Sequence, residues 1–134
     1  MEQEVIKHKG KILCHIFRKE IQAGGVRFLT PESYTLQLGL LEHPKNTILK
    51  DHAHNKKVKY NVDTTQEFLY IESGRVRVNI FSDDWEKVAS RILTSGDFLL
   101  HVSGGHGFKI LKKVRMIEIK QGPYPGEKIA KVYR

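Results

Sequence analysis

The sequence predicts an all-β domain, built as a sandwich or a small barrel, and three observations support this prediction. Short segments of alternating or continuous apolar residues recur along the chain. Glycine, proline, asparagine and aspartate mark turns between these segments at hairpin distances. Only the segment that starts at Trp85 has the apolar spacing of a helix. Many short strands separated by polar turns are typical of β-sandwiches and barrels.

One domain over residues 1–134 is expected from length and composition. A chain of 134 residues is long enough to enclose a single hydrophobic core. Hydrophobic residues make up 40% of it and charged residues 28%, which is the range of globular proteins. No internal repeat and no linker rich in proline, glycine or serine divides the sequence.

The sequence also predicts a cytoplasmic location without a membrane partner. Its apolar runs are too short to cross a bilayer, and the acidic start Met1–Glu4 lacks the apolar core of an export signal. Cys14 is the only cysteine, so no internal disulfide can form. A chain without disulfides fits a reducing compartment, and Cys14 itself is expected in the core.

A net charge of +8 raises the question of an anionic partner. The basic residues fall into several short groups, and none of them matches a nucleic-acid-binding module. The alternation of aromatic and basic residues that binds single-stranded RNA is also missing. We therefore expect no nucleic-acid partner and a mostly solvated basic surface, while an anionic small molecule remains a possible ligand.

In the first half of the chain, strands are expected over residues 5–16 and 34–40. The first segment alternates loosely, and Ala23-Gly24-Gly25 ends it. The second alternates strictly between leucines or tyrosine and smaller or polar residues. Residues 47–50 then lead into His52-Ala53-His54. On a strand, two residues separated by one point to the same face, so both imidazoles would share one side.

The second half begins with a strand end and a loop over residues 56–66 and continues with more strands. Residues 68–71 read as a buried strand, and Glu72-Ser73-Gly74-Arg75 as a tight turn. The segment up to residue 80 alternates between buried and polar positions.

The remaining elements follow a turn at Ser82-Asp83-Asp84. Residues 85–93 fit an amphipathic helix locally, but the neighbouring strands lie at hairpin distances, which favours a strand over residues 87–93. A last strand is expected over residues 115–120, followed by a basic tail.

The polar residues of the central region form a recognisable pattern. His52-x-His54 is followed by Glu67-x6-Gly74, and later by Gly96-Asp97 and a glycine-rich turn ending in His106. This pattern resembles the two sequence motifs of the cupins. The interval between His54 and Glu67 is longer than in the family, and the turn before His106 is one residue shorter and lacks the usual proline.

The resemblance implies a double-stranded β-helix, or jelly roll, with a metal inside the barrel and frequent homodimerisation. Carried over residue by residue, it makes His52, His54, Glu67 and His106 the metal ligands. Imidazole and carboxylate suit a divalent transition metal such as iron, manganese, nickel, copper or zinc. The chain looks like the small cupins found beside bacterial polysaccharide and nucleotide-sugar enzymes.

Further residues are candidates for the chemistry and for binding a small-molecule ligand. His101 is a candidate general acid or base near the metal, or a structural histidine. Arg75 and Arg77 can bind phosphate or carboxylate through paired hydrogen bonds, although their alternation with valines also fits a solvated or dimer-facing surface. Tyr60 is a candidate for lining the barrel mouth.

Three functional hypotheses follow, and whether the chain is an enzyme stays open among them. The first is a metal-dependent isomerase or epimerase acting on a small, anionic, carbohydrate-related metabolite. The second is a metal-free nucleotide-sugar ketoisomerase or epimerase that uses the histidine pair as acid and base. The third is a ligand-binding or regulatory cupin without catalysis.

Overall fold

A computed structural model describes residues 2–134, which divide into two compact units. The first comprises residues 2–21 together with Thr64–Arg134, and we call it the curled-sheet unit. The second is Gln22–Asp63, which we call the loop unit. Each is described by itself.

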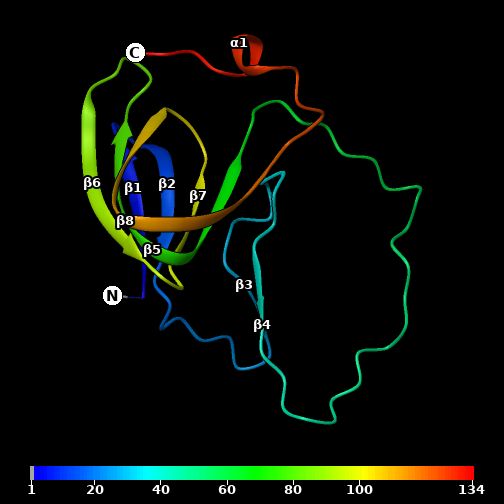
Figure 1. The fold of residues 1–134 in the computed structure, drawn as a ribbon. Coiled ribbons are helices and arrows are strands. Elements are labelled where there is room, and N and C mark those ends of the chain that lie inside the picture. Colours follow the sequence, from blue (N-terminus) through cyan, green and yellow to red (C-terminus); the bar gives the residue numbers. More distant parts are fainter. Residues whose placement is uncertain (1) are drawn as a thin grey trace. The chain divides into compact units, whose positions relative to one another are not determined.

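The curled-sheet unit confirms the prediction of an all-β fold. Its strands are β1 (Gln3–His8), β2 (Lys11–Phe17), β5 (Glu67–Phe81), β6 (Lys87–Thr94), β7 (Phe98–His101) and β8 (Gly105–Lys120). They form one sheet in the order β1-β2-β7-β5-β6, and β8 pairs with β5. All these pairings are antiparallel. The sheet curls strongly into a half-barrel (Figure 1). The jelly-roll topology implied by the cupin resemblance stays a prediction.

The curl runs through β5 and β8, which have 15 and 16 residues. They pair from Glu67 opposite Lys120 to Phe81 opposite Gly105, with register shifts near Ser73. Gly74 lies there with a φ of +96°. The tight turn predicted over residues 72–75 is therefore wrong, because the chain bends at a bulge and continues as the same strand.

Other strand predictions for this unit are confirmed. Residues 5–16 form β1 and β2, joined by a turn in which Lys9 and Gly10 have positive φ. The strand expected over 87–93 is β6, so the helical alternative is excluded. Trp85 has a φ of +66° and lies in the turn before it. The strand predicted over 115–120 is only the end of β8, whose first residues were not predicted.

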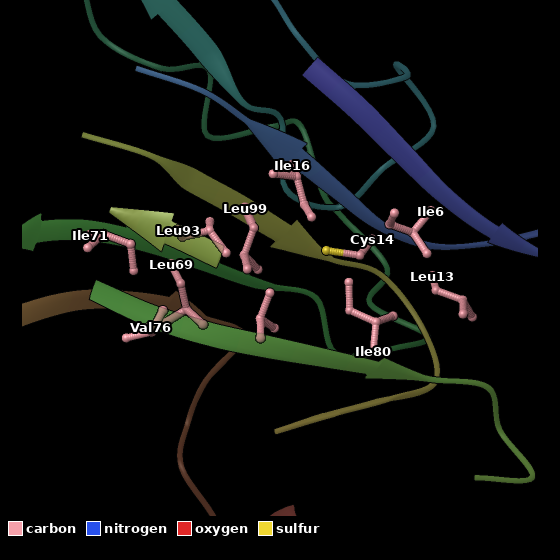
Figure 2. Close-up of a cluster of buried hydrophobic side chains, with 11 residues drawn as sticks. Ile6, Leu13, Cys14, Ile16, Leu69, Ile71, Val76, Ile80, Leu93 and Leu99 are labelled. Carbon is pink, nitrogen blue, oxygen red and sulfur yellow. The ribbon is translucent and has the colours of Figure 1, made fainter. Parts of the chain in front are cut away.

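The core of the half-barrel consists of aliphatic side chains from five of its strands (Figure 2). They are Ile6, Leu13, Cys14, Ile16, Leu69, Ile71, Val76, Val78, Ile80, Leu93 and Leu99. Burial, with a contribution from Glu4, raises the pKa of the Cys14 thiol from 9.0 to about 12. The thiol therefore stays protonated, as expected of a small core residue.

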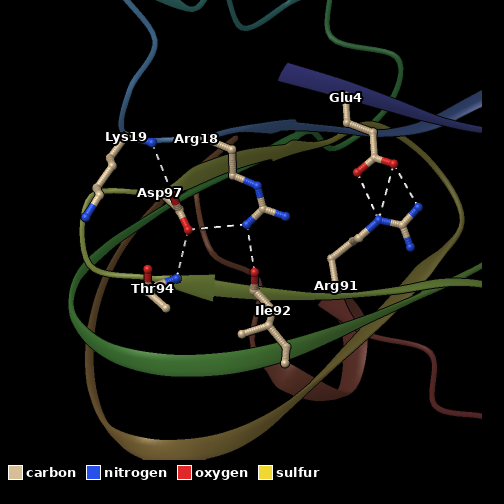
Figure 3. A network of polar contacts seen from close by, with 7 residues as sticks. All are labelled: Glu4, Arg18, Lys19, Arg91, Ile92, Thr94 and Asp97. Carbon is tan, nitrogen blue, oxygen red and sulfur yellow. Dashed lines mark hydrogen bonds and ion pairs between the residues drawn. The ribbon is translucent and has the colours of Figure 1, made fainter. Parts of the chain in front are cut away.

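A polar network fastens the turn before β7 to the rest of the unit (Figure 3). Asp97 accepts hydrogen bonds from the backbone N–H groups of Lys19 and Thr94 at 3.0 and 2.9 Å. The Arg18 Nη1 atom lies 3.3 Å from Asp97 Oδ2 and donates to the Ile92 carbonyl at 2.7 Å. The Gly96-Asp97 pair of the second motif therefore has a structural role, because Asp97 holds the turn before β7 in place.

The loop unit contains two short strands, β3 (Val26–Phe28) and β4 (Gly39–Leu41), which pair antiparallel. The strand predicted over 34–40 is wrong for all but its last two residues. Gln37 instead donates side-chain hydrogen bonds to the carbonyls of Pro31 and Tyr34, which closes a turn. Residues 42–63 contain neither helix nor strand, so the loop predicted after residue 56 is confirmed, while the strand end predicted there is wrong.

The basic tail of the curled-sheet unit contains a short helix, α1 (Glu127–Ala130). Among the described residues, no helix has the length and apolar character needed to cross a membrane.

Candidate functional site

Three ionisable side chains meet on the inner face of the curled sheet, and we call Glu67, His101 and His106 the histidine cluster. Glu67 begins β5 and lies opposite His101, the last residue of β7. His101 in turn lies opposite the core residue Cys14, which places this row on the core side of the sheet.

His106 reaches the same place from the far end of the β5–β8 ladder. It pairs with the core residue Ile80 and therefore points inward as well. Its Nε2 atom lies 3.2 Å from Glu67 Oε1, and its ring centroid is 4.1 Å from that of His101. Because β5 curls, Glu67 and His106, whose partner Ile80 lies 13 residues after Glu67 on β5, become neighbours. Three of the predicted site residues thus lie together.

The hydrogen bond of His101 fixes its protonation. Its Nε2 atom lies 3.0 Å from the Gly104 carbonyl oxygen. A carbonyl can only accept, so Nε2 carries the proton and Nδ1 is an acceptor. Burial and the neighbouring His106 lower the pKa of His101 from 6.5 to about 4. His101 is therefore a neutral imidazole at physiological pH.

Glu67 fixes His106 in the same way. Burial alone would raise the pKa of Glu67, but its hydrogen bond with His106 and the charge interaction outweigh burial and lower the pKa from 4.5 to about 2. An ionised carboxylate only accepts, so Nε2 of His106 donates to Glu67, and Nδ1 is the ring nitrogen that can accept a hydrogen bond in the neutral imidazole. Glu118 and Lys120 lie beside Glu67 on the paired strand β8, and Lys120 Nζ is 3.0 Å from Glu118 Oε1.

Two ring nitrogens of the histidine cluster remain without a partner and are available to a ligand. Nδ1 of His101 and Nδ1 of His106 are both buried and have no hydrogen-bond partner among residues 2–134. A buried acceptor without a partner costs about 1–3 kcal/mol. A ligand that supplies O–H or N–H groups would recover this energy. An imidazole held by a carboxylate, with its other nitrogen free, is also the arrangement of a general base.

His52 and His54 belong to the loop unit and are exposed. Their ring centroids are 5.6 Å apart, and Nδ1 of His52 lies 2.9 Å from the Lys50 carbonyl oxygen. The expectation that a strand would aim both at one point is wrong, because residues 42–63 contain no strand. Tyr60 lies in the same stretch and is 81% exposed.

Arg75 and Arg77 lie on β5, but on its outer face. They alternate with the core residues Val76 and Val78, so their side chains leave the sheet on the side opposite the histidine cluster. Their predicted role in binding the substrate stays a prediction, as does that of Tyr60.

The sequence did not reveal the contributions of Glu118, Lys120 and the Gly104 carbonyl. The first two have no motif of their own, and only the pairing of β8 with β5 brings them to Glu67. The only sequence signal for these two residues is the alternation of polar and apolar residues along the last part of β8, which includes Glu118 and Lys120.

A metal site with three ligands is not assembled within the described part of the chain. No group of three or more His, Cys, Asp or Glu residues in 2–134 has an arrangement suited to a metal ion. The predicted set of four ligands draws on both units, and it stays a prediction.

Comparison of the chain with protein-family models, with curated proteins and with solved structures finds no match. Membership of the cupins therefore stays a prediction that rests on the motif pattern alone.

Proposed function

We propose that the curled-sheet unit binds a small, anionic, carbohydrate-related metabolite and moves protons on it, as isomerases and epimerases do. One observation carries this proposal: the buried imidazole of His101 and the half-buried imidazole of His106 each have Nε2 held by an acceptor and a buried Nδ1 without a partner. The hydroxyl groups of a carbohydrate are donors of the kind that these two nitrogens lack.

In this proposal His106 is the base. Its Nδ1 takes a proton from the carbon next to the substrate carbonyl, and the electron pair of the broken C–H bond moves toward the carbonyl oxygen. Return of the proton to the former carbonyl carbon, with transfer of the neighbouring hydroxyl proton to the former carbonyl oxygen, gives an isomer. Return to the other face of the same carbon gives an epimer. Glu67, whose pKa of about 2 keeps it ionised, stabilises the imidazolium without taking its proton.

His101 and Lys120 would position the substrate. Nδ1 of His101 accepts a hydrogen bond from a substrate hydroxyl and holds it beside His106. Lys120 pairs with Glu67 across the β5–β8 ladder and supplies a cation for the anionic group of the substrate.

Deuterium exchange tests the proposal. The protein would be incubated in D₂O with a panel of keto-sugar nucleotides, and NMR would follow deuterium at the carbon beside the carbonyl. We expect exchange with the wild type and a loss of about a hundred-fold or more in His106→Asn. His43→Asn, which changes an exposed histidine of the loop unit, is the matched control. Absence of exchange across the panel would contradict the proposal.

A divalent metal ion is the second candidate, and a distance favours it. Glu67 Oε1 and His106 Nε2 are 3.2 Å apart, which suits two neighbouring ligands that each lie about 2.0–2.2 Å from one ion. A bound ion would supply Lewis-acid polarisation of a substrate oxygen. Glu67 and His106 would hold it from the curled-sheet unit.

Metal analysis of untagged protein tests this second candidate. We expect about one equivalent in the wild type and a clear loss in Glu67→Gln. A content below about a tenth of an equivalent, or one that Glu67→Gln leaves unchanged, would exclude it.

A further inference from the structure

Strand β8 is an edge strand over its full length. It has 16 residues and pairs with β5 and with no other strand of the described chain (Figure 1). Outside that ladder, no backbone hydrogen bond of residues 105–120 to another segment occurs in residues 2–134. A strand that is bonded on one side leaves every second N–H and C=O on its other side open to a further strand.

The same strand carries large apolar residues that are exposed. Ile110, Leu111, Ile117 and Ile119 have exposed fractions of 50%, 38%, 45% and 53%. Their positions fall on both faces of β8. An exposed edge with apolar side chains on both faces is a surface suited to pairing with another extended chain.

Positive charge determines which chain fits. On the outer face, Lys109 lies opposite Arg77 and Lys112 lies opposite Arg75. None of these four side chains forms an ion pair with another described residue. Like charges that face each other across a ladder repel. The outer face beside the open edge therefore carries a positive charge at each of these four positions.

These charges disfavour a second copy of this chain as the occupant. Residues 105–120 contain five lysines or arginines and one glutamate, so pairing of two β8 strands would bring two positive strands together. An acidic strand would instead be attracted, and its alternate apolar residues could cover the exposed isoleucines.

We propose that the free edge of β8 binds an extended, acidic segment of a partner protein, which adds to the sheet as a further antiparallel or parallel strand. Main-chain hydrogen bonds would supply affinity, and Lys109 and Lys112 would select the acidic sequence. A polyanion without a peptide backbone would use the charges alone, leaving the open edge and the apolar residues without a role.

Peptide binding to the full chain tests this proposal. The probe is a fluorescent peptide of about ten residues that alternates Glu and Val, long enough to cover most of β8. We expect binding by fluorescence anisotropy, and at least about ten-fold weaker binding when every second amide is N-methylated, because charge is retained while donors are lost. A peptide of alternating Lys and Val should not bind.

Protein variants give the second half of the test. Lys109→Glu combined with Lys112→Glu should weaken the acidic peptide about ten-fold or more. Lys45→Glu combined with Lys128→Glu makes the same change in net charge at exposed positions outside β8 and should have little effect. Circular dichroism would verify that both variants are folded.

Four results would overturn the proposal. Equal binding of the N-methylated peptide, or equal weakening in the control variant, would reduce the interaction to general charge attraction. Tighter binding of a single-stranded oligothymidylate than of the peptide would make the surface a nucleic-acid site. A homodimer of the unliganded chain that the peptide dissociates would make a second copy the natural occupant.

Discussion

At the scale of single residues, Glu67 controls the histidine cluster. Its carboxylate holds Nε2 of His106 and thereby leaves Nδ1 as the basic atom. Glu67→Gln keeps an acceptor of the same size but removes the charge that would stabilise an imidazolium. We expect deuterium exchange to fall about a hundred-fold or more. The unfolding midpoint at neutral pH should fall as well, because the fold favours the ionised carboxylate over a neutral group. An unchanged exchange rate, measured beside the ¹⁵N imidazole shifts, would exclude His106 as a carboxylate-assisted base.

The pKa values of the cluster predict how stability depends on pH. The pKa of His101 is 6.5 ordinarily and about 4 in the fold, so the unfolded chain binds more protons between these values. The contribution of His101 to the free energy of unfolding should therefore be fully present above pH 6.5. It should decline as pH falls toward 4, by on the order of 3 kcal/mol. Glu67 adds a further decline between pH 4.5 and about 2.

Urea unfolding at a series of pH values checks this expectation. His101→Gln should remove the first decline and leave the second, because the glutamine has no proton to gain. An identical pH profile in the variant would show that another group causes the acid sensitivity.

Site residues were predictable where motif and tertiary structure agree. Glu67, His101 and His106 were singled out from the sequence, and they do lie together. For His52 and His54 the prediction assumed a strand, but the stretch around them contains none, although residues 58–62 alternate between apolar and polar side chains.

At the scale of elements, the bulge at Gly74 shapes the site. Its φ of +96° is open to glycine and strained for other residues, and a Cβ added there would lie 2.1 Å from the Lys113 carbonyl oxygen. We expect Gly74→Ala to destabilise the fold by roughly 2 kcal/mol or more, because both the backbone and β8 must shift.

Gly107→Ala is the matched control for this prediction. Gly107 lies on the same strand pair, and a Cβ there meets no atom within 4 Å. Unfolding midpoints and amide exchange along β8 would compare the two variants. Equal midpoints would show that the bulge tolerates a side chain and does not hold the curl.

Strands and turns were predicted correctly where the local sequence and its neighbours fit only one kind of element. The choice of strand for β6 was correct because the turns on both sides constrained its length. Glu72-Ser73-Gly74-Arg75 has the chemistry of a turn, and only its pairing with β8 makes it a bulge. Residues 34–40 alternate like a strand, but β3 pairs only with the segment that starts at Gly39.

At the scale of the whole molecule, the two proposals use different surfaces of one sheet. The histidine cluster lies on the inner face of the half-barrel, while the peptide surface is the free edge of β8 and its outer face. Variants of Lys109 and Lys112 should therefore leave deuterium exchange unchanged, and variants of His106 should leave peptide binding unchanged. The homodimer implied by the cupin resemblance stays a prediction, and the charge of β8 argues against pairing through that strand.

The division into two units gives the last prediction, which separates proton transfer from metal chemistry. His52 and His54 are exposed, and no described acidic residue forms an ion pair with either. His52→Ala combined with His54→Ala should thus change the free energy of unfolding by less than about 0.5 kcal/mol.

If Glu67, His101 and His106 suffice for proton transfer, the double variant should exchange deuterium within about two-fold of the wild type, whereas His106→Asn should not. If the predicted four-ligand set is correct, the double variant should instead lose both metal and exchange, because a divalent ion held by only two protein donors binds weakly. Parallel measurement of metal content and exchange in the two variants therefore decides whether the histidines of the loop unit belong to the chemistry.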